Sequence, residues 1–147
     1  MYLLDTNIVS ADAPTKQGIG VEAFAAWVRS NGNRLYLSAV TIAEIEAGIA
    51  RAVRIGASTK ADRLRRWLDA VEHFYGGRIL AFGVMEAREA GAILDRARAH
   101  NPGFEDIAIA ATAVVHGLTV LTANERHFIP LGVPVANPLK ELPAASS

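Results

Sequence analysis

The chain has no cysteine, no surplus of charge of either sign and no long apolar run. Without cysteine, a disulfide framework and a thiolate metal site are both excluded. The 15 acidic and 15 basic residues balance, so any affinity for a polyanion has to be local. No apolar run is long enough to span a bilayer, and the first residues do not resemble a signal peptide. We therefore expect a soluble, cytoplasmic protein that makes no membrane contact.

What the sequence does contain is an alternation of short apolar segments with segments of helical periodicity. With 147 residues, 51% of them apolar, the chain fits a single domain, expected over residues 1–138, followed by a flexible tail over 139–147. The alternation predicts an α/β fold with a central parallel sheet of four to five strands. Two helices, from Thr41 to Val53 and from Ala61 to Tyr75, are expected to form a hairpin beside the sheet. Strands are expected at Tyr2 to Leu4, Leu35 to Leu37, Arg78 to Phe82 and Leu118 to Leu121, with an edge strand near Val133 to Val135.

Three carboxylates, Asp5, Glu44 and Asp106, each stand where an apolar run gives way to a predicted helix start. If the preceding strands are parallel, all three lie at the carboxyl edge of the sheet, where open α/β folds bind ligands. Each carboxylate has a structural explanation when taken alone: Asp caps helices, and the run from Thr41 to Glu44 is a capping-box pattern. Taken together they favour a functional site, because clustered carboxylates repel one another unless a cation is present.

The chemistry of these three side chains favours a hard metal ion. Oxygen ligands, with no cysteine and no histidine pair at metal-binding spacing, indicate Mg²⁺, with Mn²⁺ as a substitute. We expect Asp5 and Asp106 to hold the metal, and Glu44 to complete the site by binding or orienting a metal-bound water. Such a site hydrolyses phosphodiesters, because the metal screens the phosphate charge and activates the attacking water. The sequence thus predicts a small metal-dependent nuclease.

Other polar residues lie near the three carboxylates in the predicted fold. They can hydrogen-bond the ligands or position the substrate, although turn chemistry explains them equally well. Asn124 follows the fourth strand, where its amide oxygen can complete the pocket. The histidines at positions 73, 100, 116 and 127 share no metal-binding spacing and are interpreted as structural. The supporting candidates are Thr6, Asn7, Ser10, Ser38, Thr122 and Asn124.

Basic residues are concentrated in the predicted hairpin. Six of them fall within the sixteen positions from Arg51 to Arg66. A solvated helical face is one interpretation of this cluster. A basic rim that holds a phosphate backbone beside the metal site is the other.

Four motifs in this chain resemble the PIN-domain family and, within it, the VapC-type toxins of bacterial toxin–antitoxin modules. The resemblance implies a three-layer α/β/α domain and a Mg²⁺-dependent endoribonuclease that inhibits growth by cutting RNA. It also implies a homodimer and neutralisation by a small VapB-like antitoxin. The antitoxin is expected to bind in a groove beside the hairpin and to push a basic side chain into the acidic pocket. The motifs are Leu3-Leu4-Asp5-Thr6-Asn7, Ser38 with Thr41 to Gly48, Asp106 to Ala113, and Leu121 to Asn124 before Phe128.

The same resemblance assigns roles to individual positions. It maps the acidic residues of the family onto Asp5, Glu44 and Asp106, and a fourth site position onto Asn124. His127 stands where the family often has a further Asp. One tightly held ion, with another recruited by substrate, is therefore expected.

Other protein classes fit less well. A haloacid-dehalogenase-type phosphatase needs a second acid two residues after the first, where Asn7 stands, and a receiver domain needs paired acids and a late lysine that are absent. The remaining alternative is a catalytically inactive PIN-like module that acts through a protein partner or by occluding RNA. The presence of all three carboxylates argues against that alternative.

Overall fold

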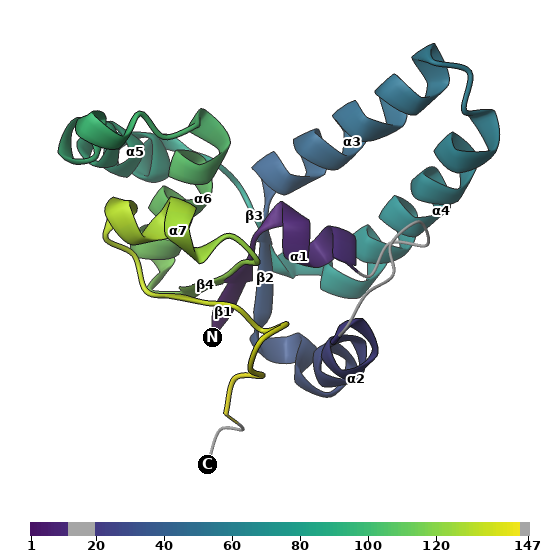
Figure 1. Cartoon of the computed structure of the whole chain (residues 1–147), viewed down its shortest axis with the longest axis horizontal. Helices are drawn as coiled ribbons and strands as arrows, with labels where there is room; N and C mark the ends of the chain where they lie inside the picture. The colour runs from purple at the N-terminus through teal and green to yellow at the C-terminus, as the bar shows by residue number, and fades with distance from the viewer. Residues whose placement is uncertain (12–19, 145–147) are drawn as a thin grey trace.

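Five short strands, all parallel, form the centre of the protein in our computed structural model, which describes residues 1–11 and 20–144 (Figure 1). The strand order is β3-β2-β1-β4-β5, and β1 is paired in parallel with both β2 and β4. The predicted parallel α/β fold is therefore confirmed. The strands are β1 (Tyr2–Leu4), β2 (Leu35–Ser38), β3 (Ile79–Leu80), β4 (Thr119–Leu121) and β5 (Val135–Ala136).

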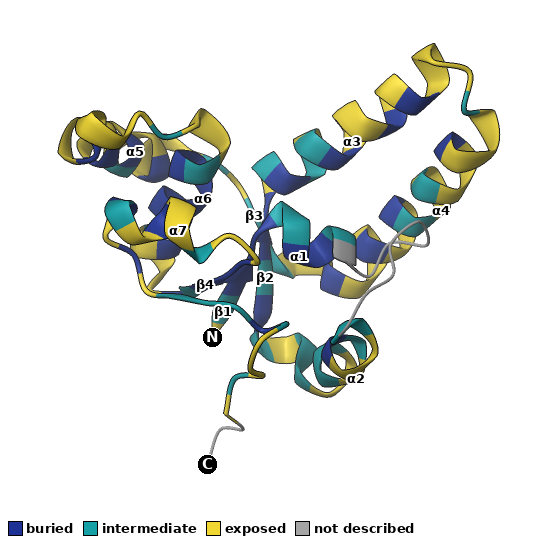
Figure 2. Ribbon diagram, viewed as in Figure 1, coloured by how far each residue is buried: buried dark blue, intermediate teal, exposed yellow. Residues whose placement is uncertain are grey.

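Helices cover both faces of this sheet and make two separate cores (Figure 2). Leu3 packs into the core on the side of α5 and α6, whereas Leu4 packs into the core formed with α1, α2 and the α3–α4 hairpin. Both leucines are buried, because side chains alternate between the faces of a central strand. The α-helices are α1 (Thr6–Ala11), α2 (Val21–Asn31), α3 (Ala39–Arg54), α4 (Ser58–Tyr75), α5 (Val84–Arg96), α6 (Phe104–His116) and α7 (Glu125–Phe128). The 3₁₀ turns are η1 (Gly32–Arg34), η2 (Gly76–Arg78), η3 (Arg98–His100) and η4 (Ile129–Leu131).

The predicted helical hairpin is present, but its first helix begins earlier than expected. Ser38, not Thr41, is the N-cap of α3, and its hydroxyl accepts a hydrogen bond from the backbone N–H of Val40 at 3.1 Å. The capping box expected from Thr41 to Glu44 is therefore wrong. Ser38 has extended backbone geometry directly after β2, which places its hydroxyl over the first free N–H groups of the helix.

The helix that carries the third carboxylate also begins earlier than predicted. Gly103 precedes α6, which starts at Phe104, so Asp106 lies within the first turn rather than at the helix start. A negative charge in this turn interacts favourably with the helix dipole. Gly117 ends the helix in the left-handed conformation with φ of 67°, as the sequence predicts.

The end of the described chain is attached to the domain at Leu139, which packs against the core on the side of α2 and α4. Of the tail expected from 139 to 147, the last three residues lie outside the described part of the chain. Within residues 1–11 and 20–144, we find no helix with the length and apolar character needed to cross a membrane.

Candidate metal centre and active site

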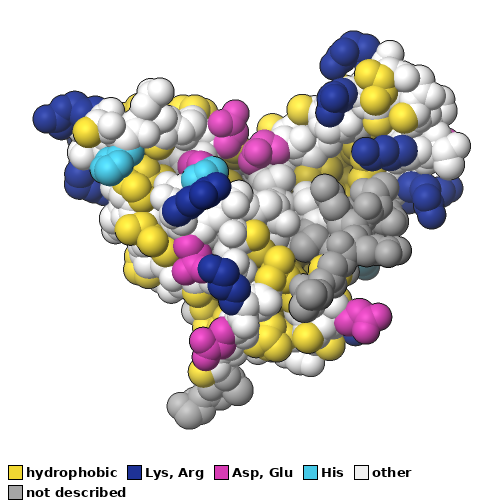
Figure 3. Space-filling view, in the orientation of Figure 1, with side chains coloured by type: hydrophobic (Ala, Val, Ile, Leu, Met, Phe, Trp, Pro, Cys, Tyr) yellow, Lys and Arg dark blue, Asp and Glu magenta, His cyan; other side chains and the backbone are white. Residues whose placement is uncertain are grey.

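The three predicted carboxylates come from separate elements that meet at the carboxyl edge of the sheet. Asp5 directly follows β1, Glu44 lies in the second turn of α3, and Asp106 lies in the first turn of α6. The lobe of α5 and α6 and the projecting α3–α4 hairpin stand on opposite sides of this edge (Figure 1). Acidic side chains gather in the hollow between them (Figure 3). The open space at this edge leaves room for a ligand.

Asp5 is the most buried of the three carboxylates, with only 6% of its surface exposed. One carboxylate oxygen accepts the N–H of Thr6 at 2.8 Å, and the other accepts the hydroxyl of Thr122 at 2.9 Å. Burial raises the pKa of Asp5, these two hydrogen bonds oppose the rise, and the carboxylate of Asp106 adds to it. Asp5 is thus held in a fixed orientation, in surroundings where burial outweighs the hydrogen bonds that stabilise its negative charge.

Glu44 is held in place by Thr6. The Thr6 hydroxyl donates to a Glu44 carboxylate oxygen at 2.6 Å and lies 3.1 Å from the buried Thr41 hydroxyl. Since a hydroxyl has one hydrogen, Thr6 uses it on Glu44 and accepts from Thr41. Burial raises the pKa of Glu44, as do the charges of Asp5 and Glu105, whereas the hydrogen bond from Thr6 lowers it.

Asp106 faces a histidine across the site. Its carboxylate lies 3.5 Å from Nδ1 of His127, which is carried by α7. Burial raises the pKa of Asp106 most, and the carboxylates of Glu44 and Glu105 raise it further, while His127 opposes the rise. His127 thus lies beside the predicted site, and its interpretation as a structural histidine stays a prediction. Residue spacing does not reveal this position, because it depends on how the short helix α7 packs beside α6.

Thr122 joins the carboxylates to the turn after β4. Its hydroxyl donates to Asp5 and lies 3.0 Å from the N–H of Asn124 and 3.4 Å from the amide nitrogen of Asn7. The Asn7 oxygen in turn accepts the N–H of Ala123 at 3.2 Å. Both contacts hold α1 against this turn. The turn after β4 therefore holds Asp5 directly, through the Thr122 hydroxyl, and indirectly, through the contacts of Asn7 on α1.

The other predicted supporting residues have different roles in the structure. Ser38 is buried and caps α3, and within the described part of the chain its hydroxyl makes no hydrogen bond to a carboxylate. The Asn124 side chain is exposed and makes no cap hydrogen bond to α7, so only its backbone contributes to the Thr122 network. Asn124 as a fourth site residue stays a prediction. Ser10 is half-buried in α1, and its side chain forms no hydrogen bond within the described residues.

The donor set fits a divalent cation. Asp5, Glu44 and Asp106 supply only oxygen ligands, and each raises the pKa of another through like-charge repulsion, which a bound cation would relieve. Within residues 1–11 and 20–144, no group of three or more acidic or histidine side chains is arranged so that it could hold a metal ion. Mg²⁺ keeps several waters and is commonly bound through one or two carboxylates, so two of these side chains are enough for the proposed site.

We expect replacement of Thr122 by valine to weaken the site more than the fold. Valine keeps the shape but removes the hydrogen bonds of the Thr122 hydroxyl to one Asp5 carboxylate oxygen and to the N–H of Asn124, which costs about 1–3 kcal/mol in unfolding free energy. Loss of this support should also lower metal affinity about 10- to 100-fold. Urea unfolding and a Mn²⁺ titration measure the two effects.

Thr112→Val is the matched control for that experiment. Thr112 is also fully buried, but among the described residues its hydroxyl hydrogen-bonds only to the carbonyl of Ala108, within α6. We expect this variant to bind Mn²⁺ as the unchanged protein does. Equal loss of Mn²⁺ affinity in both variants would show that Thr122 acts through general stability and not through Asp5.

The sheet order, the two helical layers and the acidic edge define the class of this protein. The model of the PIN domain matches residues 2–130, and the chain belongs to this family. It is 33% identical over 141 residues to the toxin FitB of Neisseria gonorrhoeae, covering 94% of this chain and 98% of the relative. It is 31% identical over 142 residues to a VapC ribonuclease of Sinorhizobium fredii, covering 94% and 97%.

Solved structures show the same relationship at the level of the fold. The crystal structure of FitAcB from Neisseria gonorrhoeae superposes with a TM-score of 0.80 and 34% sequence identity. The match covers 94% of this chain and 98% of that chain. The resemblance to PIN-domain toxins predicted from the four motifs is thus confirmed over nearly the full length.

Proposed function

We propose that this protein is a Mg²⁺-dependent endoribonuclease and the toxin of a VapBC-type toxin–antitoxin system. One observation carries the proposal: Asp5, Glu44 and Asp106, from three different elements, interact electrostatically at one sheet edge. A relative covering the same length is a VapC ribonuclease. An oxygen-only site of this kind suits phosphodiester hydrolysis, as in other metal-dependent nucleases.

Each residue of the site has a distinct task in this mechanism. Asp5 and Asp106 would hold the cation, which supplies charge screening and an acidified water when bound. Glu44, oriented by Thr6, would bind or orient the attacking water. Thr122 keeps the Asp5 carboxylate in position. Attack in line on phosphorus would then leave a 5′-phosphate and a 3′-hydroxyl.

An apolar hollow supports the proposed antitoxin partner. A space of about 420 Å³ lies between α1, α2 and α4, lined mainly by apolar side chains, among them Ile8, Phe24 and Val71. An apolar segment of a VapB-like antitoxin can fill such a hollow. From there, a basic side chain of the antitoxin would pair with the site carboxylates in place of the metal.

A homodimer is the second assembly that we propose. Val84, Met85 and Val114 are large apolar residues exposed to solvent on α5 and α6. Exposed apolar surface of this kind is typical of protein interfaces. Pairing of two copies through this face would cover it.

Cleavage of total cellular RNA tests the proposed activity. The purified protein should produce discrete fragments with Mg²⁺ and none with EDTA, and the Asp5→Asn variant should produce none in either buffer. Cleavage that is indifferent to both EDTA and Asp5 would indicate a contaminating nuclease. Absence of cleavage by the unchanged protein would favour the inactive PIN-like binding module.

A further inference from the structure

A second hollow lies directly beside the acidic site, on the lobe of α5, α6 and α7. Its volume is about 340 Å³, and its wall includes Asp106 and His127 from the site together with His100, Asn101 and Arg126. Figure 3 shows histidine and basic side chains next to the acidic ones on this lobe. The hollow therefore shares a wall with the proposed metal centre.

The walls of this hollow are held by backbone and side-chain hydrogen bonds. Asn101 adopts the left-handed conformation with φ of 45°, which Asn tolerates better than most residues. Its N–H donates to the carbonyl of Arg98 at 3.3 Å. On the other wall, the Arg96 guanidinium donates to the carbonyl of Leu131 at 3.1 Å. The hollow is thus bounded by a defined turn and not by loose side chains alone.

Arg126 is the free cation of this hollow. Its side chain is exposed, and within residues 1–11 and 20–144 it takes part in no ion pair or hydrogen bond. By contrast, Arg98 on the same lobe pairs with Asp95 at 3.7 Å, and Arg65 on the hairpin pairs with Glu46 at 3.5 Å. A free guanidinium is a strong binder of phosphate oxygens.

We propose that this hollow binds the RNA nucleotide next to the scissile phosphodiester, with Arg126 on its phosphate and the imidazoles of His100 and His127 beside its sugar or base. The inference rests on the proposed ribonuclease function and names where its substrate strand lies. The site carboxylates repel RNA, and the chain has no net charge to attract it. A free cation that shares the Asp106 wall supplies the attraction where the strand must pass.

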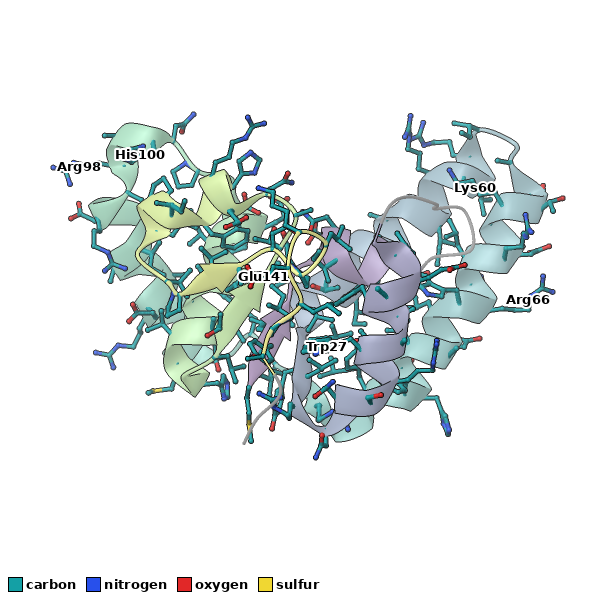
Figure 4. All side chains as sticks on the ribbon, turned by 60° about the horizontal axis from the view of Figure 1, so that its bottom comes forward. Trp27, Lys60, Arg66, Arg98, His100 and Glu141 are labelled. Carbon is teal, nitrogen blue, oxygen red and sulfur yellow. The ribbon has the colours of Figure 1, made fainter. Side chains whose placement is uncertain are left out.

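The hollow also suits a single strand better than a duplex. Its volume is in the range of small-ligand pockets of about 300–1,000 Å³, which accommodates one splayed nucleotide. Unstacked bases of single-stranded RNA commonly stack on histidine or aromatic rings. The hairpin basic cluster from Arg51 to Arg66 is the competing RNA surface. Figure 4 places Lys60 and Arg66 on the hairpin, across the molecule from His100.

RNA binding, measured apart from cleavage, tests this inference. Asp5→Asn protein in EDTA would be titrated into fluorescein-labelled single-stranded polyuridylate, and fluorescence anisotropy recorded over a range of salt concentrations. Adding Arg126→Gln should weaken binding about tenfold and reduce the slope of log K against log salt by about 0.7, the value of one single-stranded phosphate contact. His100→Asn should weaken binding without changing that slope.

Two control variants, Arg98→Gln and Arg66→Gln, each remove one positive charge outside the hollow. Arg98 lies on the same lobe as the hollow, and Arg66 lies on the hairpin (Figure 4). We expect both to leave affinity and salt slope unchanged, with all variants keeping the melting temperature of the parent. An equal loss in Arg98→Gln, or a loss confined to Arg66→Gln, would overturn the inference, the latter placing the RNA on the hairpin.

Failure of the inferred nucleotide site can be distinguished from failure of the proposed nuclease function. In otherwise unchanged protein, Arg126→Gln should raise KM for RNA cleavage and leave kcat near its original value. If cleavage proves indifferent to EDTA and to Asp5, the metal-dependent nuclease is rejected, while the anisotropy result still decides whether the hollow binds RNA. If cleavage requires both and Arg126→Gln leaves affinity and KM unchanged, only the inferred subsite is rejected.

Discussion

Replacing Asp106 by asparagine is expected to abolish RNA cleavage and, in EDTA, to stabilise the protein. Cleavage should fall about a thousandfold or more, since metal-assisted charge stabilisation contributes several kcal/mol to the transition state. Stability should rise because burial and the carboxylates of Glu44 and Glu105 disfavour the ionised form of Asp106, raising its pKa. Rates of RNA cleavage and urea unfolding in EDTA measure the two effects.

Asp95→Asn is the control for this prediction. Asp95 is an exposed acidic residue of α5 whose only pairing within the described residues is the surface contact with Arg98. Surface pairs of this kind contribute little to stability. The control should therefore change neither cleavage nor unfolding. An Asp106→Asn protein that cleaves RNA normally, or is less stable than the parent in EDTA, would contradict the assignment of Asp106 to a metal site.

Adding Mg²⁺ is expected to stabilise the protein strongly near neutral pH and little in acid. At a concentration about 100 times the dissociation constant, binding to the folded state alone adds about 2.7 kcal/mol to the unfolding free energy. In acid, at about pH 4, the raised pKa values leave the site carboxylates more protonated than ordinary carboxyl groups, and protonated carboxylates bind metal poorly. Urea unfolding with Mg²⁺ and with EDTA, at about pH 7.5 and about pH 4, measures the difference.

The same pKa shifts predict how the metal-free protein responds to pH. Below the ordinary carboxyl pKa, folded and unfolded states are both protonated at these positions. As pH rises from there to the raised folded values, the unfolded state loses its protons first, so the contribution of Asp5, Glu44 and Asp106 to stability falls. Metal that stabilises equally at both pH values would contradict binding through these carboxylates.

The contribution of Glu86 to stability changes with pH in the opposite direction. The pKa of Glu86 is lowered most by a hydrogen bond from its own backbone N–H. Hydrogen bonds from His116 and from the N–H of Gly83 lower it further. The stability from Glu86 is present above the ordinary carboxyl pKa and is lost as pH falls through the lowered value. The informative quantity is therefore the difference between Mg²⁺ and EDTA at each pH, in which the contribution of Glu86 cancels.

Local patterns in the sequence are enough to predict the sheet and the edge of the sheet at which the three carboxylates lie. Tyr2 to Leu4 is apolar on both faces and gives way to capping residues, which defines a buried strand followed by a helix. The periodicity of the segments from Thr41 to Tyr75 likewise defined the hairpin. The confirmed alternation of strands and helices then placed Asp5 at the carboxyl edge.

What could not be predicted depends on contacts between distant segments. Thr41 fits a capping box by local pattern, yet Ser38 takes that role because β2 runs directly into α3. His127 has no partner at any informative spacing, and only the packing of α7 beside α6 brings it to Asp106. The hollow that includes Arg126 is lined by two segments remote in sequence, residues 100–106 and 126–131. These features required the tertiary structure.

Calorimetric titration of Mn²⁺ into the unchanged protein, Glu44→Gln and Glu46→Gln is the most direct test of the central claim, a divalent cation bound at the site of Asp5, Glu44 and Asp106. Glu44 and Glu46 lie two residues apart on α3, but Glu46 is exposed and pairs with Arg65. We predict that the unchanged protein and Glu46→Gln bind Mn²⁺ alike, and that Glu44→Gln binds it about tenfold or more weakly. Absence of Mn²⁺ binding by the unchanged protein, or equal affinity in all three, would contradict the account.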